Sequence, residues 1–128
     1  MIASQSMNST NAFRVAAAAG FLGVALGAFG AHGLKAVLEK NNTVDVWKTA
    51  SLYHLAHAVV MLYIAGRSPL PFAPWALFLA GIVIFSGSLY LLAVTGIHWL
   101  GAITPFGGLC FLAGWLWMAV KPFAAGQS

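Results

Sequence analysis

Long stretches without a charged side chain constrain this chain more than any other feature. Asp, Glu, Lys and Arg are absent from residues 15–34, 49–66 and 68–120. As an α-helix, the first stretch of 20 residues would span about 30 Å, the hydrocarbon thickness of a bilayer. Inside hydrocarbon the backbone must satisfy its own hydrogen bonds, and long apolar runs without alternation do so as helices. The sequence therefore predicts an all-α integral membrane protein.

The composition argues against several other classes of protein. Of the 128 residues, 61% are hydrophobic and 6% are charged, whereas soluble domains carry roughly 25% charged residues. The basic side chains are scattered at the ends of the apolar runs, without the basic and aromatic cluster that follows a phosphate backbone, so nucleic acid is not an expected partner. The sequence has no acid pair and no serine-hydrolase, phosphate-loop or dinucleotide pattern. Neither an enzyme nor a cofactor is expected.

Polar and helix-breaking residues divide the chain into segments. Residues 33–48 hold five of the eight charged side chains and predict a first polar connection. The prolines of residues 69–74 predict a tight turn, and the 53 uncharged residues of 68–120 must fold back near Gly96, because one helix of that length would exceed any bilayer. We therefore expect one domain, residues 1–128, folded as a four-transmembrane-helix bundle. Its predicted parts are a flexible tail at 1–11 and spans near 13–34, 48–66, 74–95 and 99–120. A signal peptide is a competing interpretation of the first span, although no basic segment precedes it.

Small residues recur along the first predicted span. Gly23, Gly27 and Ala31 lie four apart, with Gly20 and Gly30 beside them. In lipid, small residues at this spacing let a neighbouring helix approach closely, so we expect the first helix to be central. The alternative is that glycine is simply common in membrane helices.

The second predicted span carries polar rings where a membrane helix usually carries leucine. Tyr53, His54 and His57 lie within two turns of one another, and His32 is expected at a similar depth near the end of the first span. Ionisable groups at membrane depth are costly, so these side chains should face the interior and find partners. We expect both second-span histidines to point at the first helix.

Two kinds of role are open for these histidines. They can donate hydrogen bonds to carbonyls or to hydroxyls of the third span and so fix helix register; the hydroxyls in the predicted polar core are Ser86, Ser88 and Tyr90. Alternatively, His32, His54 and His57 are candidate ligands for copper or zinc, with bis-histidine haem ligation or a proton relay as further versions.

The fourth predicted span contains a second irregular sequence. Thr104 and Pro105 remove a backbone hydrogen bond, and Gly107 and Gly108 leave the backbone approachable. We expect a kink there, which could also act as a hinge.

Several blocks resemble a known family. They are Gly27–Leu34 (GAFGAHGL), Tyr53–Ala58 (YHLAHA), Phe85–Tyr90 (FSGSLY) and Ile103–Gly108 (ITPFGG), followed by Gly114 and Trp115. In this order they are similar to the signature blocks of the YgdD-like proteins. That resemblance implies a small four-helix bacterial inner-membrane protein of unknown function, with a small transmembrane counterpart in animals and no catalytic residues to transfer.

Together these observations predict a structural or accessory multi-pass protein of the bacterial inner membrane with a histidine-containing polar core. Its expected partners are membrane lipids, and a second copy of the chain or another membrane protein. The alternative is a metal- or proton-binding transporter or sensor. Three basic side chains fall on each predicted side, so the positive-inside rule does not decide the orientation. We expect cytoplasmic termini, because Lys35 can lie partly inside the bundle.

Overall fold

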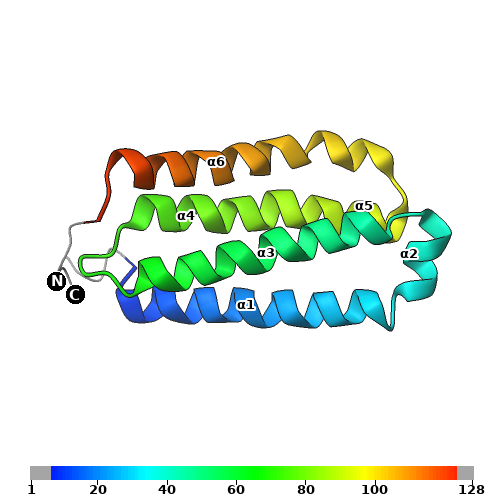
Figure 1. Ribbon diagram of the computed structural model, residues 1–128, viewed down its shortest axis with the longest axis horizontal. Helices are drawn as coiled ribbons and strands as arrows, with labels where there is room; N and C mark the ends of the chain where they lie inside the picture. Colours follow the sequence, from blue (N-terminus) through cyan, green and yellow to red (C-terminus); the bar gives the residue numbers. More distant parts are fainter. Residues whose placement is uncertain (1–6, 124–128) are drawn as a thin grey trace.

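The computed structural model describes residues 7–123. Its helices are, in chain order, α1 (Ser9–Ala31), α2 (Lys35–Asn41), α3 (Val44–Ala65), α4 (Phe72–Gly81), the π-helical turn η2 (Ile82–Ser86), α5 (Gly87–Thr95), the 3₁₀ turn η3 (His98–Ala102) and α6 (Thr104–Val120). Figure 1 shows that α4, η2 and α5 form one continuous rod, which lies between α3 and α6.

The observed helices follow the predicted spans closely, with three differences. Residues 1–6 of the predicted tail lie outside the described residues, but the tail prediction is wrong for Ser9 and the two residues after it, because they form the first turn of α1. The side chain of Asn8 caps this turn by accepting the Asn11 backbone N–H at 2.8 Å. The polar connection is ordered, because it contains α2. A π-helical turn, which the sequence did not predict, interrupts the third rod.

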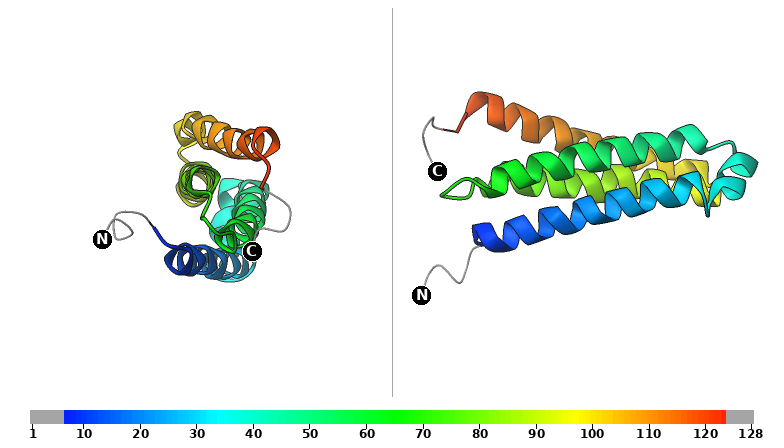
Figure 2. Two further views of the ribbon diagram at one scale, coloured as in Figure 1. Left: turned by 90° about the vertical axis from the view of Figure 1, so that its left-hand side faces the viewer. Right: turned by 60° about the horizontal axis from the view of Figure 1, so that its bottom comes forward.

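The first helix is not central, contrary to expectation. Helix α3 packs against α1 on one side and against α4 and α5 on the other, while α6 packs against α4 and η2. Figures 1 and 2 show α1 and α6 on opposite outer sides of the molecule. The inner position belongs to α3 because it carries polar rings that would be costly against lipid, whereas α1 offers mainly alanine, glycine and aliphatic surface.

Within residues 7–123, three helices are long and apolar enough to cross a membrane. They are Ser9–Ala31, Phe72–Thr95 and His98–Val120. Helix α3 is equally long, with 22 residues, but its histidines and Lys48 lower its hydropathy, and it is not one of the three. The helix packed most centrally is therefore the least apolar of the long helices.

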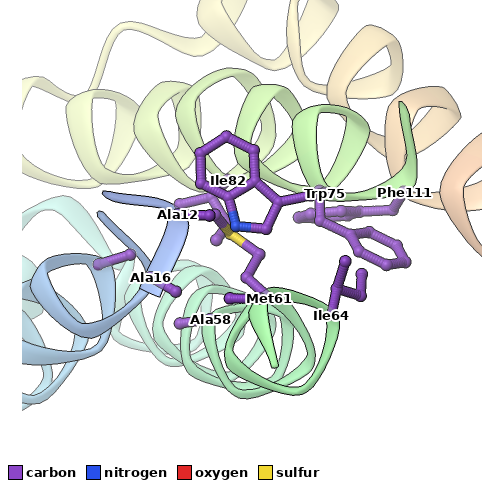
Figure 3. Close-up of a cluster of buried hydrophobic side chains, with 11 residues drawn as sticks. Ala12, Ala16, Ala58, Met61, Ile64, Trp75, Ile82 and Phe111 are labelled. Atoms are coloured by element: carbon purple, nitrogen blue, oxygen red, sulfur yellow. The ribbon is translucent and has the colours of Figure 1, made fainter. Parts of the chain in front are cut away.

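An apolar cluster fills the half of the molecule nearest the start of α1. Trp75 and Met61 are almost fully buried there, packed with Phe111 and with Ala12 and Ala16 of α1 (Figure 3). The alanines leave room for the Trp75 indole, since they present only a β-carbon to it. This cluster joins all four rods at the end of the molecule opposite α2.

The predicted kink near Pro105 takes a different form. Helix α6 begins at Thr104, so Pro105 lies in its first turn, where a missing N–H costs nothing because that N–H has no intrahelical partner. The change of direction is made by η3, which precedes α6 as a tighter helix. Gly107 then packs directly on the backbone of Phe85 in η2, so that a β-carbon there would overlap it.

Candidate functional site

The imidazole of His54 connects three helices. It is 4% exposed, and its Nε2 lies 2.8 Å from the Ala19 carbonyl oxygen of α1 while its Nδ1 lies 2.9 Å from the Tyr90 hydroxyl of α5. Because a carbonyl only accepts, Nε2 carries the proton, and Nδ1 accepts from the tyrosine O–H. The Tyr90 oxygen also lies 3.5 Å from the Ser51 hydroxyl of α3. Both ring nitrogens are therefore occupied by partners within the chain.

Trp47 makes the same kind of contact one heptad earlier in α3. Its Nε1 donates to the Leu26 carbonyl oxygen at 2.8 Å, and Leu26 follows Ala19 by seven residues in the antiparallel partner α1. The Trp47 ring also lies 4.6 Å from the Tyr90 ring, centroid to centroid. Two ring N–H groups of α3 thus bond to the backbone of α1 two turns apart.

A glycine stands four residues after each accepting carbonyl, Gly23 after Ala19 and Gly30 after Leu26. In an α-helix the carbonyl of residue i points toward residue i+4, so a side chain at i+4 flanks that oxygen. A β-carbon at Gly30 would overlap the Trp47 indole, whereas one at Gly23 would come within 2.7 Å of the Leu55 side chain and lie 3.4 Å from Cδ2 of His54, an ordinary contact. Gly30 therefore lets the indole reach an already hydrogen-bonded carbonyl, and Gly23 makes room for Leu55 beside the His54 ring.

His57 points away from α1 and toward α6. Its Nδ1 lies 2.8 Å from the Tyr53 carbonyl oxygen, so Nδ1 carries the proton, and Nε2 accepts from Nε1–H of Trp115 in α6 at 3.0 Å. The ring stacks on Phe111 with centroids 3.8 Å apart, and His57 is 6% exposed. The expectation that both histidines point at α1 is confirmed for His54 and wrong for His57.

The predicted serines connect the third rod to both of its neighbours. Ser86 is fully buried and donates to the Ala50 carbonyl oxygen of α3 at 2.8 Å. Ser88 donates to the Phe85 carbonyl oxygen in its own rod at 3.0 Å, and its hydroxyl lies 2.6 Å from that of Thr104 in α6. These hydroxyls hold helices together, and Thr104 has this role in addition to starting α6.

The three candidate metal ligands are not brought together. His32 is exposed at the end of α1, while His54 and His57 reach different neighbouring helices with both nitrogens of each ring already hydrogen-bonded. Across residues 7–123, no group of three or more His, Cys, Asp or Glu side chains is placed to hold a metal ion. Tyr53, the other predicted member, is 41% exposed and packs against Phe85 with the ring planes tilted by 45°.

The predicted small-residue stripe packs only in part. Besides the two glycines under the rings, Gly27 faces α3, where a β-carbon would meet Ser51 at 3.9 Å. A β-carbon at Gly20 would have no heavy atom within 4 Å, and Ala31 is exposed. The predicted packing role is therefore not supported for Gly20 and Ala31.

Comparison with known proteins identifies the family of this chain. The model of the family described as "Protein of unknown function (DUF423)" matches residues 26–108. The chain belongs to this family. A UPF0382 membrane protein of Staphylococcus haemolyticus is 46% identical over 107 residues, covering 80% of this chain and 86% of that protein. The UPF0382 membrane protein YwdK of Bacillus subtilis is 45% identical over 106 residues, covering 77% and 85%. No solved structure matches.

These relatives confirm that the chain is a bacterial membrane protein of an uncharacterised family, as the resemblance to the YgdD-like proteins implied. Four of the quoted blocks fall inside the DUF423 match, and only Gly114 and Trp115 lie beyond it. The animal counterpart stays a prediction.

Sequence reasoning missed several polar contacts of this DUF423 chain: those of the Trp47 and Trp115 indoles and a group at the α2 end. Thr43 donates to the Ala93 carbonyl oxygen at 2.7 Å, and the Asn41 amide donates to the same oxygen at 3.1 Å. Helix α5 ends there at Gly96, whose φ of 72° is the left-handed conformation that glycine favours. The terminal carbonyls of α5 are thus satisfied by the α2–α3 connection. The adjacent polar pair at residues 41–42 was the available signal, but its partner lies about 50 residues away.

Proposed function

We propose that this chain is a non-enzymatic structural or accessory protein of the bacterial inner membrane. In this proposal all four rods cross the bilayer, and the polar groups around His54 and His57 fix the register of the helices. Its partners are membrane lipids and either a second copy or another membrane protein. The observation that carries the proposal is that all four nitrogens of the two buried rings are engaged within the chain.

Hydrogen-bond geometry favours a structural role over transport. A carrier of metal or protons needs a ring nitrogen whose lone pair or proton is available to the cargo. His54 and His57 have opposite tautomers, each fixed by one backbone carbonyl, so moving a proton through either ring requires breaking an interhelical contact. The metal- or proton-binding alternative therefore has less support.

The length and position of α3 support a fourth crossing. Its 22 residues rise about 33 Å, and it runs beside α1 and the third rod along their length. An inner helix needs less hydropathy than an outer one, because protein rather than lipid covers its polar side chains. With four crossings, the start of α1 and the end of α6 lie on one side, which we place in the cytoplasm.

Single cysteines test this topology. In a Cys110→Ala background, Asn42→Cys, Ser68→Cys and Ile97→Cys each place a thiol in an exposed turn. A membrane-impermeant maleimide should label Asn42→Cys and Ile97→Cys in intact cells, and Ser68→Cys only after the membrane is opened. Labelling of Asn42→Cys and Ile97→Cys from opposite sides would contradict the four crossings. The reverse pattern at all three positions would contradict only the orientation.

Nitrogen-15 NMR of the purified protein tests the role of the rings. We expect His54 to be protonated at Nε2 and His57 at Nδ1, with neither signal changed by added Zn²⁺. The exposed His98 is the internal control, since it exchanges its proton with water. A zinc-dependent shift at His54 or His57, or exchange between tautomers as fast as at His98, would favour the transporter or sensor instead.

Replacing both rings separates structure from activity in cells. His54→Gln with His57→Gln should lower the abundance and the unfolding temperature of the protein, because four internal hydrogen bonds lose their geometry. Normal abundance and stability together with a lost cellular phenotype would overturn the structural role. Identification of proteins that co-purify with the wild-type chain would name the partner.

A further inference from the structure

A cavity of about 380 Å³ opens between α1, α2 and α3 at the α2 end of the molecule. Gly27, Gly30 and Trp47 form part of its apolar wall, and Lys35, Glu39 and Lys48 also line it. The cavity therefore combines an apolar interior with a small cluster of charges.

The two lysines mark the level of the bilayer surface. Lys35 directly follows the uncharged residues 15–34, and Lys48 directly precedes the uncharged residues 49–66. Lysine at the end of a membrane helix extends its ammonium group to the level of the lipid phosphates. Because α1 and α3 are antiparallel neighbours, both ammonium groups lie at the same surface of the membrane.

The apolar wall leads from this surface toward the interior of the bilayer. Two of its positions are glycines, so α1 presents bare backbone there, and the indole of Trp47 is held in place by its hydrogen bond to the Leu26 carbonyl oxygen. Ser51, one turn further along α3, lines the deep end. An acyl chain and its glycerol fit such a wall better than a soluble anion does, because a soluble anion has no apolar part to bury.

The charges select the head group. Two ammonium groups and one carboxylate leave a net charge of +1 on the lining, which complements the single negative charge of a phosphodiester. We propose that this cavity binds one anionic phospholipid, with its phosphate between Lys35 and Lys48 and one acyl chain along Gly27 and Gly30. This inference rests on the proposed crossing of α3 and adds a defined lipid partner to it.

Native mass spectrometry in detergent, with phosphatidylglycerol or phosphatidylcholine added at equal mole fraction, tests the site. We expect one phosphatidylglycerol to be retained and phosphatidylcholine not to be. Since a lysine near a membrane surface contributes about fivefold to the binding of anionic lipid, Lys35→Gln and Lys48→Gln should each weaken retention about fivefold. Lys40→Gln is the matched control, because Lys40 is exposed on the same short helix but does not line the cavity. If all three lysine variants lost phosphatidylglycerol equally, the lipid would be held by the overall positive charge of the protein, and the proposed site would be wrong.

Two further variants test the shape and the sign of the charge. Gly27→Leu should fill the wall and reduce retention without changing charge, since a β-carbon there meets only ordinary contacts; thermal unfolding verifies that this variant is folded. Glu39→Gln should strengthen phosphatidylglycerol retention. Weaker retention in Glu39→Gln, or unchanged retention in Gly27→Leu, would overturn the proposal.

A third arm distinguishes lipid from a free anion. Inorganic phosphate at millimolar concentration should neither compete with phosphatidylglycerol nor raise the unfolding temperature, and competition by phosphate would overturn the lipid assignment. Cysteine labelling that agrees with four crossings, combined with no selectivity for phosphatidylglycerol, would reject the lipid site alone. Labelling that contradicts the crossing of α3 would reject the proposed topology.

Discussion

Two adjacent glycines in α6 should respond very differently to the same substitution. Gly107 lies against the backbone of Phe85 in η2, and a β-carbon there would overlap the Phe85 nitrogen and come within 2.7 Å of its Cα. At Gly108 the nearest atom to a β-carbon is Cδ2 of the same phenylalanine, at 3.8 Å. We therefore expect Gly107→Ala to destabilise the protein and Gly108→Ala to be tolerated.

The contacts at the two glycines give the size of the expected difference in free energy of unfolding between the two variants. Ordinary contact begins at 3.4 Å, so the 2.7 Å approach to Cα, with the nitrogen closer still, requires α6 to move away from η2 by more than about 0.7 Å. The obstacle is backbone, which cannot rotate aside as a side chain can. Overpacking lowers the free energy of unfolding by about 1–3 kcal/mol, and we take about 3 kcal/mol because the obstacle is backbone. Alanine has a higher helix propensity than glycine, which returns about 1 kcal/mol. Gly107→Ala should thus lower the free energy of unfolding by about 2 kcal/mol. Gly108→Ala should raise it by about 1 kcal/mol, since its only effect is the higher helix propensity of alanine.

The assay is unfolding of the purified protein by SDS in mixed micelles, which gives the free energy of unfolding of each variant. The two variants should differ by about 3 kcal/mol. Because the movement also separates Ser88 from Thr104, whose hydroxyls lie 2.6 Å apart, Thr104→Val should cost less in the Gly107→Ala background than in the wild type. Stabilities of the two alanine variants within 1 kcal/mol of each other would refute the close approach of α6 to η2.

Two further substitutions test the ring contacts of α3. Gly30→Ala should destabilise the protein by about 1–2 kcal/mol in the same assay, because the new methyl group displaces the Trp47 indole from its carbonyl. Gly20→Ala in the same helix meets no atom within 4 Å and should be neutral or stabilising, so equal effects would contradict the packing of α1 on α3. Trp115→Phe keeps a ring in α6 but removes the donor to His57, and it should cost about 1 kcal/mol. An unchanged nitrogen-15 shift of the His57 Nε2 in that variant would show that the hydrogen bond is absent.

Positions of helix ends could be predicted because their signals are local. The third predicted span, residues 74–95, corresponds to the rod Phe72–Thr95, and the fourth, residues 99–120, corresponds to His98–Val120. Prolines, Gly96 and Lys121 stop helices by their own backbone geometry or charge, whatever packs beside them. The π-helical turn at Ile82–Ser86 had no such signal, and it lies where α6 packs closely on Phe85.

The sequence predicted that the polar side chains would be buried and would have partners inside the protein, but it did not predict which residues those partners are. Burial of His54 and His57 follows from the cost of polar groups in hydrocarbon, and both are buried. Which neighbour each ring faces does not follow, because residues three apart in a helix differ by about 60° around its axis. That angle was enough to turn His54 toward α1 and His57 toward Trp115 of α6.

By itself, the amino-acid sequence determined that this chain is helical, belongs in a membrane and turns where charges, prolines and Gly96 stand. Those properties depend on the free energy of each segment in water or in lipid. The composition of the segment and its local backbone preferences determine that free energy. Only the tertiary structure decided that α3 rather than α1 is the inner helix, that Gly30 opens a carbonyl of α1 to the Trp47 indole, and that the histidines form no common site. Such contacts depend on the relative rotation of packed helices, and rotation is set by all neighbours at once.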